Sequence, residues 1–348
     1  MSDMKTIIEK ITADETENQR IFREGGEILR RGGLVAFPTE TVYGLGANAL
    51  DTDAAAKIYA AKGRPSDNPL IVHLAHVEEA ERYCVTSDIF WKLAEAFMPG
   101  PITVVMPKRE CIPNTVTGGL DSVAIRVPSN EYARGLIKAA GVPVAAPSAN
   151  ISGRPSPTCA AHVIEDMSGR ADMIIDGGDC DIGVESTIVK LTDEGMVLLR
   201  PGGITLEMLT AIGDVTLDKA ITGKLAEGER PMAPGMKYRH YAPNTRVVML
   251  DGSDDAIYKY LNERKVFEKV GALFFEDELS AFSGLDITLV SLGAHTPEAE
   301  AHSLFAKLRE VDKYACDTFY VKVPERTGIG LAVYNRMLKA AGHEIVRI

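Results

Sequence analysis

Small polar residues gather in segment 37–46, which has the sequence Phe-Pro-Thr-Glu-Thr-Val-Tyr-Gly-Leu-Gly. The carboxylate of Glu40 and the hydroxyl of Thr41 follow a short apolar run, and Gly44 and Gly46 come next. Glycines let backbone N–H groups approach a ligand closely, and hydroxyl groups bind small polar substrates. The segment therefore predicts a binding loop, although an ordinary connection between a strand and a helix is an equal alternative.

Two cations, Lys62 and Arg64, lie two residues apart in a Gly/Pro loop that ends at Asn68. Arginine makes forked contacts and lysine acts as a point charge, so the pair can bind one phosphate chain. A basic helix end that complements the helix dipole is the alternative. His73 follows on an apolar run, where a histidine satisfied within the core would also fit.

Arg126 interrupts the apolar run 123–127. A buried arginine is costly unless it is paired with an acid. The carboxylate of a substrate would pair it, and so would Glu40 or Glu185. The residue is therefore either a substrate contact or half of a structural salt bridge.

Segment 146–156, Ala-Pro-Ser-Ala-Asn-Ile-Ser-Gly-Arg-Pro-Ser, ends an apolar run with residues too small and polar to fill a core. Ligands of open α/β sheets bind at the carboxyl ends of strands, and a helix expected near Thr158 could turn its N-terminus toward an anion. Turns that cap this helix through Ser148 and Asn150 are the alternative.

A last segment, Gly-Val-Glu-Ser-Thr-Ile at 183–188, precedes Arg200 at the end of a further apolar run. Arg200 could contact a phosphate, but alone it could equally be a surface arginine. The chain has no G-x-x-x-x-G-K-[ST] loop and no G-x-S-x-G elbow. His73 and His76 are the only close histidine pair, so no metal held by protein side chains is expected.

The elements that must position these residues alternate between helix and strand, which predicts an α/β domain over residues 1–212. A first helix is expected over 18–31, with Asn18 as its N-cap. The other expected helices cover 51–62, 88–97 and 130–140. The expected strands cover 34–37, 70–74, 102–106, 123–127, 144–146, 173–175, 187–191 and 197–199.

Residues 213–244 are expected to form a linker, because 229–244 contains three prolines. Alternation restarts after it, and about 100 residues of this kind suit a small doubly wound domain over 245–348. The expected strands are 247–250, 270–275, 287–291 and 318–323. The expected helices are 254–263, 299–314 and 329–341.

Composition limits the classes of function. A chain of 348 residues usually forms about two domains. The net charge of -11 disfavours a bare nucleic-acid-binding role. Five scattered cysteines, a polar N-terminus and the lack of a run of roughly 18 apolar residues predict a cytoplasmic protein without a membrane span.

Six motifs occur in order within residues 20–212: PTETVYGLG, KGRPSDNPL, AIRVP, APSANISG, GVESTI and LLRPGG. Together they resemble the threonylcarbamoyl-AMP synthase family. The segment PGMKYRHYAP from Pro234 and the domain after it resemble the longer, two-domain branch. The resemblance implies a YrdC-like twisted open α/β sheet domain followed by a small Rossmann-like doubly wound α/β domain.

The activity that the resemblance implies is that of a nucleotidyltransferase. It joins L-threonine, bicarbonate and ATP into L-threonylcarbamoyladenylate, with release of pyrophosphate and with Mg2+ held mainly by the nucleotide. A separate complex would transfer the product to tRNA, and a weak direct contact with tRNA is a further implication. Two alternatives remain: a carbamoyltransferase that uses carbamoyl phosphate, and an RNA-binding module without catalysis.

Site residues also follow from the resemblance. Lys62 and Arg64 would offset charge on the phosphates and are the catalytic candidates. The linker would act as a lid that excludes water. Threonine would contact Thr41, His73, Arg126, Ala146 and Ser186. ATP would contact Lys62, Arg64, Asn68, Ser122, Ser148, Asn150, Ser156, Arg200 and, from the linker, Tyr238.

Overall fold

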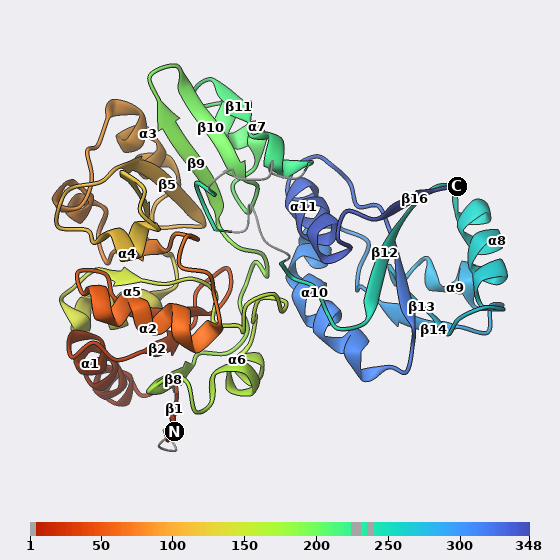
Figure 1. Ribbon diagram of the computed structural model, residues 1–348, viewed down its shortest axis with the longest axis horizontal. Coiled ribbons are helices and arrows are strands. Elements are labelled where there is room, and N and C mark those ends of the chain that lie inside the picture. The colour runs from red at the N-terminus through yellow and green to blue at the C-terminus, as the bar shows by residue number, and fades with distance from the viewer. Residues whose placement is uncertain (1–4, 224–230, 235–239) are drawn as a thin grey trace. The chain divides into compact units, whose positions relative to one another are not determined.

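The computed structural model describes residues 5–223, 231–234 and 240–348, which divide into two compact units (Figure 1). The first unit holds the described residues up to 152 and those between 156 and 234, and the second holds 153–155 and 240–348. The first unit extends past residue 212 because a strand at Val215–Leu217 still pairs with its sheet. No helix within the described residues is long and apolar enough to cross a bilayer.

The first unit is built on one large sheet. Its strands are β1 (Ile7–Lys10), β2 (Val35–Phe37), β3 (Gly44–Asn48), β4 (Ile71–His73), β5 (Ile102–Pro107), β6 (Ser122–Arg126), β7 (Val144–Ala145), β8 (Met173–Asp176), β9 (Thr187–Thr192), β10 (Gly195–Arg200) and β11 (Val215–Leu217). Within the described residues they are ordered β1-β8-β2-β3-β7-β4-β6-β5-β9-β10-β11. Parallel and antiparallel pairs are mixed, and β4 lies between antiparallel β7 and parallel β6.

Helices cover this sheet. They are α1 (Glu15–Arg30), α2 (Thr52–Lys62), α3 (Asp88–Phe97), α4 (Asn114–Thr117), α5 (Glu131–Ala140), α6 (Ala160–Met167) and α7 (Leu206–Thr210), with 3-10 turns at Val77–Arg82 and Lys219–Ile221. Helices α1 and α5 share a core cluster that includes Phe22 and Leu136. They approach so closely at Gly26 that an added Cβ would lie 2.7 Å from the backbone of Ala139. The sheet is thereby backed by tightly packed helices, and the polar loops lie at its strand ends.

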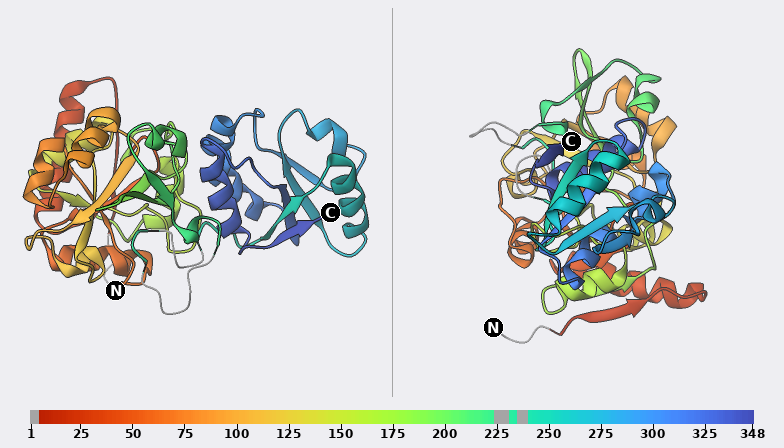
Figure 2. Two further views of the ribbon diagram at one scale, coloured as in Figure 1. Left: turned by 90° about the horizontal axis from the view of Figure 1, so that it is seen from above. Right: turned by 90° about the vertical axis from the view of Figure 1, so that its right-hand side faces the viewer.

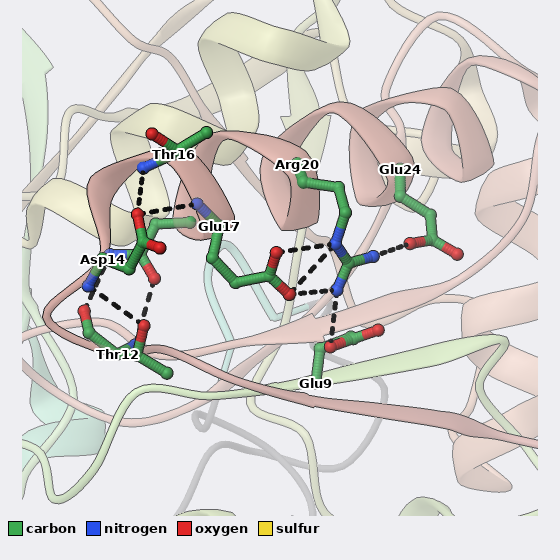
Figure 3. A network of polar contacts seen from close by, with 8 residues as sticks. Glu9, Thr12, Asp14, Thr16, Glu17, Arg20 and Glu24 are labelled. Carbon is green, nitrogen blue, oxygen red and sulfur yellow. Dashed lines mark hydrogen bonds and ion pairs between the residues drawn. The ribbon is translucent and has the colours of Figure 1, made fainter.

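The start of α1 differs from the sequence-based expectation (Figure 3). Asp14, not Asn18, is the N-cap, and its carboxylate accepts hydrogen bonds from the backbone N–H groups of Thr16 and Glu17. Asn18 is buried inside the helix and exchanges hydrogen bonds with the backbone of Thr12. The prediction of Asn18 was wrong because Asp is as good a cap as Asn, and Asp14 comes first along the chain.

The second unit contains a parallel sheet with helices on both faces. Its strands are β12 (Arg246–Asp251), β13 (Val270–Phe274), β14 (Thr288–Ser291), β15 (Thr318–Lys322) and β16 (Ile345–Arg347), and its helices are α8 (Asp254–Arg264), α9 (Leu279–Phe282), α10 (Pro297–Glu310) and α11 (Gly330–Ala340), with a 3-10 turn at Val311–Lys313. The strand order is β14-β13-β15-β12-β16. Helices α8 and α9 lie on one face and α10 and α11 on the other (Figures 1 and 2). The expected fold class, an open α/β sheet domain followed by a small doubly wound domain, is confirmed.

Candidate functional site

The first unit contains many polar side chains that are almost completely buried. An unpartnered polar group in a dry core costs roughly 1–3 kcal/mol, so an ordinary core avoids them. The large number of such side chains predicts a binding site, in which a polar ligand supplies hydrogen-bond partners for some of them. These buried side chains include Thr39, Glu40, Thr41, Lys62, Asn68, His73, Thr103, Arg126, Asn150, Ser156, Glu185, Ser186 and Arg200.

Arg126 pairs with Glu40 in this cluster. Nη2 of Arg126 lies 2.8 Å from Oε1 of Glu40, and both side chains are about 95% buried, with 4% and 5% exposed. Burial raises the pKa of Glu40, but the Arg126 guanidinium and backbone N–H groups outweigh burial and leave that pKa below its usual value. Nε of Arg126 is buried and has no hydrogen-bond acceptor among the described residues. The Arg126 guanidinium is therefore paired with one carboxylate, that of Glu40, and its Nε–H remains available to donate to a second carboxylate.

His73 lies beside Arg126, because the parallel pairing of β4 with β6 puts the two residues in register. Its Nδ1 is 3.1 Å from the carbonyl oxygen of Ile71, which can only accept, so Nδ1 carries the proton. Burial and then the Arg126 charge lower the pKa of His73 to about 3. The imidazole is therefore neutral and adds no second positive charge near Arg126.

Thr41 lies in the loop between β2 and β3, and Thr39 organises this loop. The Thr39 hydroxyl donates to the carbonyl of Val42 at 2.6 Å and accepts from the backbone N–H of Thr41 at 3.1 Å. The Thr41 hydroxyl is completely buried, 2.9 Å from that of Thr39. Glu40 lies between Thr39 and Thr41 in the sequence. The same loop therefore positions both the Thr41 hydroxyl and Glu40, the acid that pairs with Arg126.

Ala146 follows β7 directly and lies beside β4, where its N–H donates to the carbonyl of Ile71 at 2.8 Å. The same carbonyl accepts from His73, so Ala146 and His73 are neighbours. Four of the five residues expected to contact threonine, Thr41, His73, Arg126 and Ala146, are thus brought together by strand pairing and one loop.

Ser186, the fifth, comes from the segment before β9. The backbone N–H of Ile182 donates to the carbonyl of Glu40 at 2.9 Å, which joins this segment to the loop that carries Thr41. The Ser186 hydroxyl lies 2.8 Å from that of Thr103 and accepts from Nη2 of Arg200 at 3.1 Å. Arg200 is only 5% exposed, so it is not a surface arginine.

Glu185 has a partner other than Arg126. Its carboxylate accepts from the hydroxyl of Ser156 at 2.6 Å, and Ser156 is completely buried. Of the two acids that the sequence left open for Arg126, the structure selects Glu40. Ser156, expected at the nucleotide, is thereby linked through Glu185 to the neighbouring Ser186.

Lys62 and Arg64 point to different segments. Nζ of Lys62 donates to the carbonyls of Ser148, at 2.5 Å, and Asn150. Arg64 instead donates to the carbonyls of Asn68 and Pro69, at 3.3 and 3.1 Å. Lys62 is 2% exposed and so places a buried charge against the backbone of the loop that follows β7.

The remaining expected nucleotide contacts lie around the same loops. The Ser148 hydroxyl donates to the side-chain oxygen of Asn150 at 2.5 Å. Asn68 is buried, and its side-chain oxygen has no hydrogen-bond donor within the described part of the chain. Ser122 borders a cavity of about 360 Å3 that Lys190 and other residues line. Tyr238 lies outside the described residues.

Sequence reasoning missed Thr103. It lies in an otherwise apolar strand, and no local pattern marks it as functional. Its contact with Ser186 arises because β5 pairs with β9, whose residues lie about 85 positions further along the chain. Among the described residues, no three His, Cys, Asp or Glu side chains are grouped so that they could hold a metal ion.

Comparisons with known proteins cover both units. A family model described as "Telomere recombination" matches residues 27–202. A second model, described as "Threonylcarbamoyl-AMP synthase, C-terminal domain", matches residues 204–342. The matches abut near residue 203 and together span nearly the whole chain.

Individual relatives match over the same length. The threonylcarbamoyl-AMP synthase of Pyrococcus abyssi is 46% identical over 336 residues, covering 94% of this chain and 96% of that protein. The threonylcarbamoyl-AMP synthase of Bacillus subtilis is 43% identical over 341 residues, covering 97% of each. The crystal structure of P. abyssi Sua5 complexed with L-threonine matches with a TM-score of 0.89 and 43% identity, over 99% of each chain.

Proposed function

This chain belongs to the threonylcarbamoyl-AMP synthase family, and from that premise we propose which of its residues carry out the reaction of L-threonine, bicarbonate and ATP. The products are L-threonylcarbamoyladenylate, pyrophosphate and water. The observation that carries the proposal is the buried Arg126, which binds Glu40 and keeps a free donor at Nε among the described residues.

Arg126 binds the carboxylate of threonine in this proposal. A buried guanidinium binds a carboxylate strongly because both charges are removed from water and hydrogen bonds join them. The hydroxyls of Thr41 and Ser186 and the backbone at Ala146 then surround the polar groups of the amino acid. His73 is neutral and does not compete with Arg126 for the carboxylate.

The chemistry takes two steps. The amine of threonine attacks the carbon of bicarbonate, water leaves, and a carbamate forms. An oxygen of the carbamate then attacks the α-phosphorus of ATP, and the bond to pyrophosphate breaks. Neither step requires a protein nucleophile, so positioning and charge neutralisation carry the catalysis.

The nucleotide binds, in this proposal, along the loops that Lys62 organises. Lys62 and Arg64 offset negative charge as pyrophosphate leaves. The backbone contacts of Lys62 hold Ser148 and Asn150 in place, so it also shapes the loop that meets the phosphates. The other expected nucleotide contacts are Asn68, Ser122, Ser156, Arg200 and Tyr238.

We expect Mg2+ to accompany the nucleotide, with phosphate oxygens as its main ligands. The donor set of the chain fits this expectation better than a protein-held ion, because the described residues contain no group of three ligating side chains. The residues named above act on threonine and on the phosphates without a protein-held metal.

The proposal also covers how the site is shielded from water and where the product goes. Of the segment 213–244 that the sequence assigns to a linker, β11 belongs to the first sheet, so we infer that the part after β11 acts as the linker and lid that keeps water from the unstable carbamate. Residues 224–230 and 235–239 of that part lie outside the described residues. A separate complex takes the product to tRNA in the cytoplasm, and direct contact of this acidic chain with tRNA is weak.

Pyrophosphate release from ATP tests the function. We expect release to require threonine and bicarbonate together, because the carbamate is the nucleophile that displaces pyrophosphate. The measurement is a coupled pyrophosphate assay in buffer freed of carbon dioxide, with each substrate added alone and then together. Serine and valine, which each lack part of the threonine side chain, are the matched substrate controls.

The outcomes of this assay distinguish the proposed synthase from the two alternative functions. Release that ignores threonine contradicts the proposal. Release that needs carbamoyl phosphate in place of bicarbonate and threonine supports a carbamoyltransferase. Tight, salt-sensitive RNA binding with no turnover of ATP supports an RNA-binding module.

A further inference from the structure

A cavity of about 220 Å3 lies in the second unit, at the carboxyl ends of three parallel strands. Phe275 follows β13, Leu292 follows β14 and Val323 follows β15, and all three line it. The chain leaves β13 through α9 and leaves β15 through α11, on opposite faces of the sheet (Figure 1). Adjacent strands whose connections diverge in this way form a crevice, and open α/β sheets bind ligands there.

Glu300 is the most deeply buried polar residue on the wall of this cavity, where Glu278 is the other buried acid. Glu300 lies in the first turns of α10 and is only 4% exposed. Among the described residues, burial and the charges of Glu278 and Glu325 act on its carboxyl group, with no hydrogen bond among these influences, and the group borders the cavity rather than being sealed in the core. A buried carboxyl without a partner is unfavourable, and such groups in folded proteins call for an explanation.

The surroundings of Glu300 are negative. Burial, and then the carboxylates of Glu278 and Glu325, raise the pKa of Glu300 to about 7. Lys322 is the cation on the wall, but it is already paired with Asp254, at 2.8 Å, and with Glu278. The carboxylates around this cavity would therefore stabilise a bound positive charge, and Lys322 does not supply that charge because it is already paired.

The remaining walls determine the class of cation. Phe275 and Leu292 offer apolar surface, and the Phe275 ring is stacked on His295 with centroids 4.0 Å apart. His295 is itself 3.1 Å from a carboxylate oxygen of Asp277. No three His, Cys, Asp or Glu side chains among the described residues are grouped so that they could hold a metal ion. The cation that fits is therefore organic, with a short apolar body.

We propose that this cavity binds a small organic ammonium ion, with its ammonium group at Glu300 and its carbon body against Phe275 and Leu292. An amino acid fits less well, because its carboxylate would face Glu278 and Glu325. The proposal concerns the second unit alone and does not depend on the reaction assigned to the first.

Calorimetry on the full chain at pH 8 tests this site, with n-butylammonium chloride as the probe. We expect saturable binding of n-butylammonium, with no saturable heat from n-butanol or from sodium chloride at equal concentration. Glu300→Gln should weaken binding at least tenfold, because the amide keeps the shape and removes the charge. Glu325→Gln, at the exposed rim, should weaken it about threefold.

Glu298→Gln is the matched control, because Glu298 is exposed on the same turn of α10 and does not line the cavity. It should leave binding unchanged. Circular dichroism checks that each variant is folded. The proposal is wrong if no saturable binding occurs, if Glu300→Gln and Glu325→Gln both bind as tightly as the parent, if Glu298→Gln loses as much as Glu300→Gln, or if Mg2+ displaces n-butylammonium at equal concentration.

Discussion

Replacing Arg126 by alanine is expected to weaken threonine binding by about 2–5 kcal/mol, while ATP binding changes less than about threefold. The reason is that a buried guanidinium holds the threonine carboxylate, and its loss leaves that carboxylate unpaired in a dry site. Calorimetric titration with threonine and with ATP, each alone, measures the two affinities. An equal loss for both ligands would show that Arg126 acts as a structural salt bridge only.

Glu40 provides the control for this experiment. In Arg126→Ala, Glu40 keeps a buried charge without its partner, and breaking a buried pair in this way costs roughly 3–5 kcal/mol of folding stability. The double variant Glu40→Gln/Arg126→Ala removes that charge and should still fail to bind threonine. Glu40→Gln alone leaves the Arg126 guanidinium free for the substrate, so its affinity for threonine should equal or exceed that of the parent.

Most helices and strands followed from the sequence because apolar runs and helix caps are local signals. Strand β3 (Gly44–Asn48) was not predicted, because its glycines indicated a loop. The helix at Thr52–Lys62 begins after a capping Asp51 and ends at Gly63, which has a positive φ of 62° and so suits glycine. Strand β1 was not predicted, because three of its four residues are exposed and it lies at the sheet edge. Edge strands bury little apolar surface, so the hydrophobic pattern hardly marks them.

The sequence indicated which residues belong to the candidate site, but it did not indicate which of them form ion pairs with one another. Arg126 needed an acid, and both Glu40 and Glu185 satisfied that requirement in the sequence. The choice depends on strand order, because the alignment of β4 with β6 and the loop after β2 decide which acid reaches Arg126. Sequence patterns describe the faces of single strands and carry little information about which strands are neighbours.

Replacing Lys62 by methionine is expected to lower the rate of pyrophosphate formation by about 10²–10³, with threonine affinity unchanged. Methionine keeps most of the volume of the side chain and removes the charge that neutralises the departing pyrophosphate. It also removes the donor to the carbonyls of Ser148 and Asn150. Steady-state kinetics at varied ATP concentration gives kcat and KM separately.

Those two constants distinguish the roles of Lys62. If its charge acts on the transition state, kcat falls and the KM for ATP changes little. If Lys62 only anchors the loop at 148–150, KM for ATP rises while kcat is kept, and the catalytic role is wrong. Lys57→Met is the matched control, because Lys57 lies on the same helix and its Nζ donates to the carbonyl of Gly32 at 2.6 Å. The control removes the same charge from α2 away from the loop, so a comparable loss of kcat in Lys57→Met would assign the effect to net charge alone.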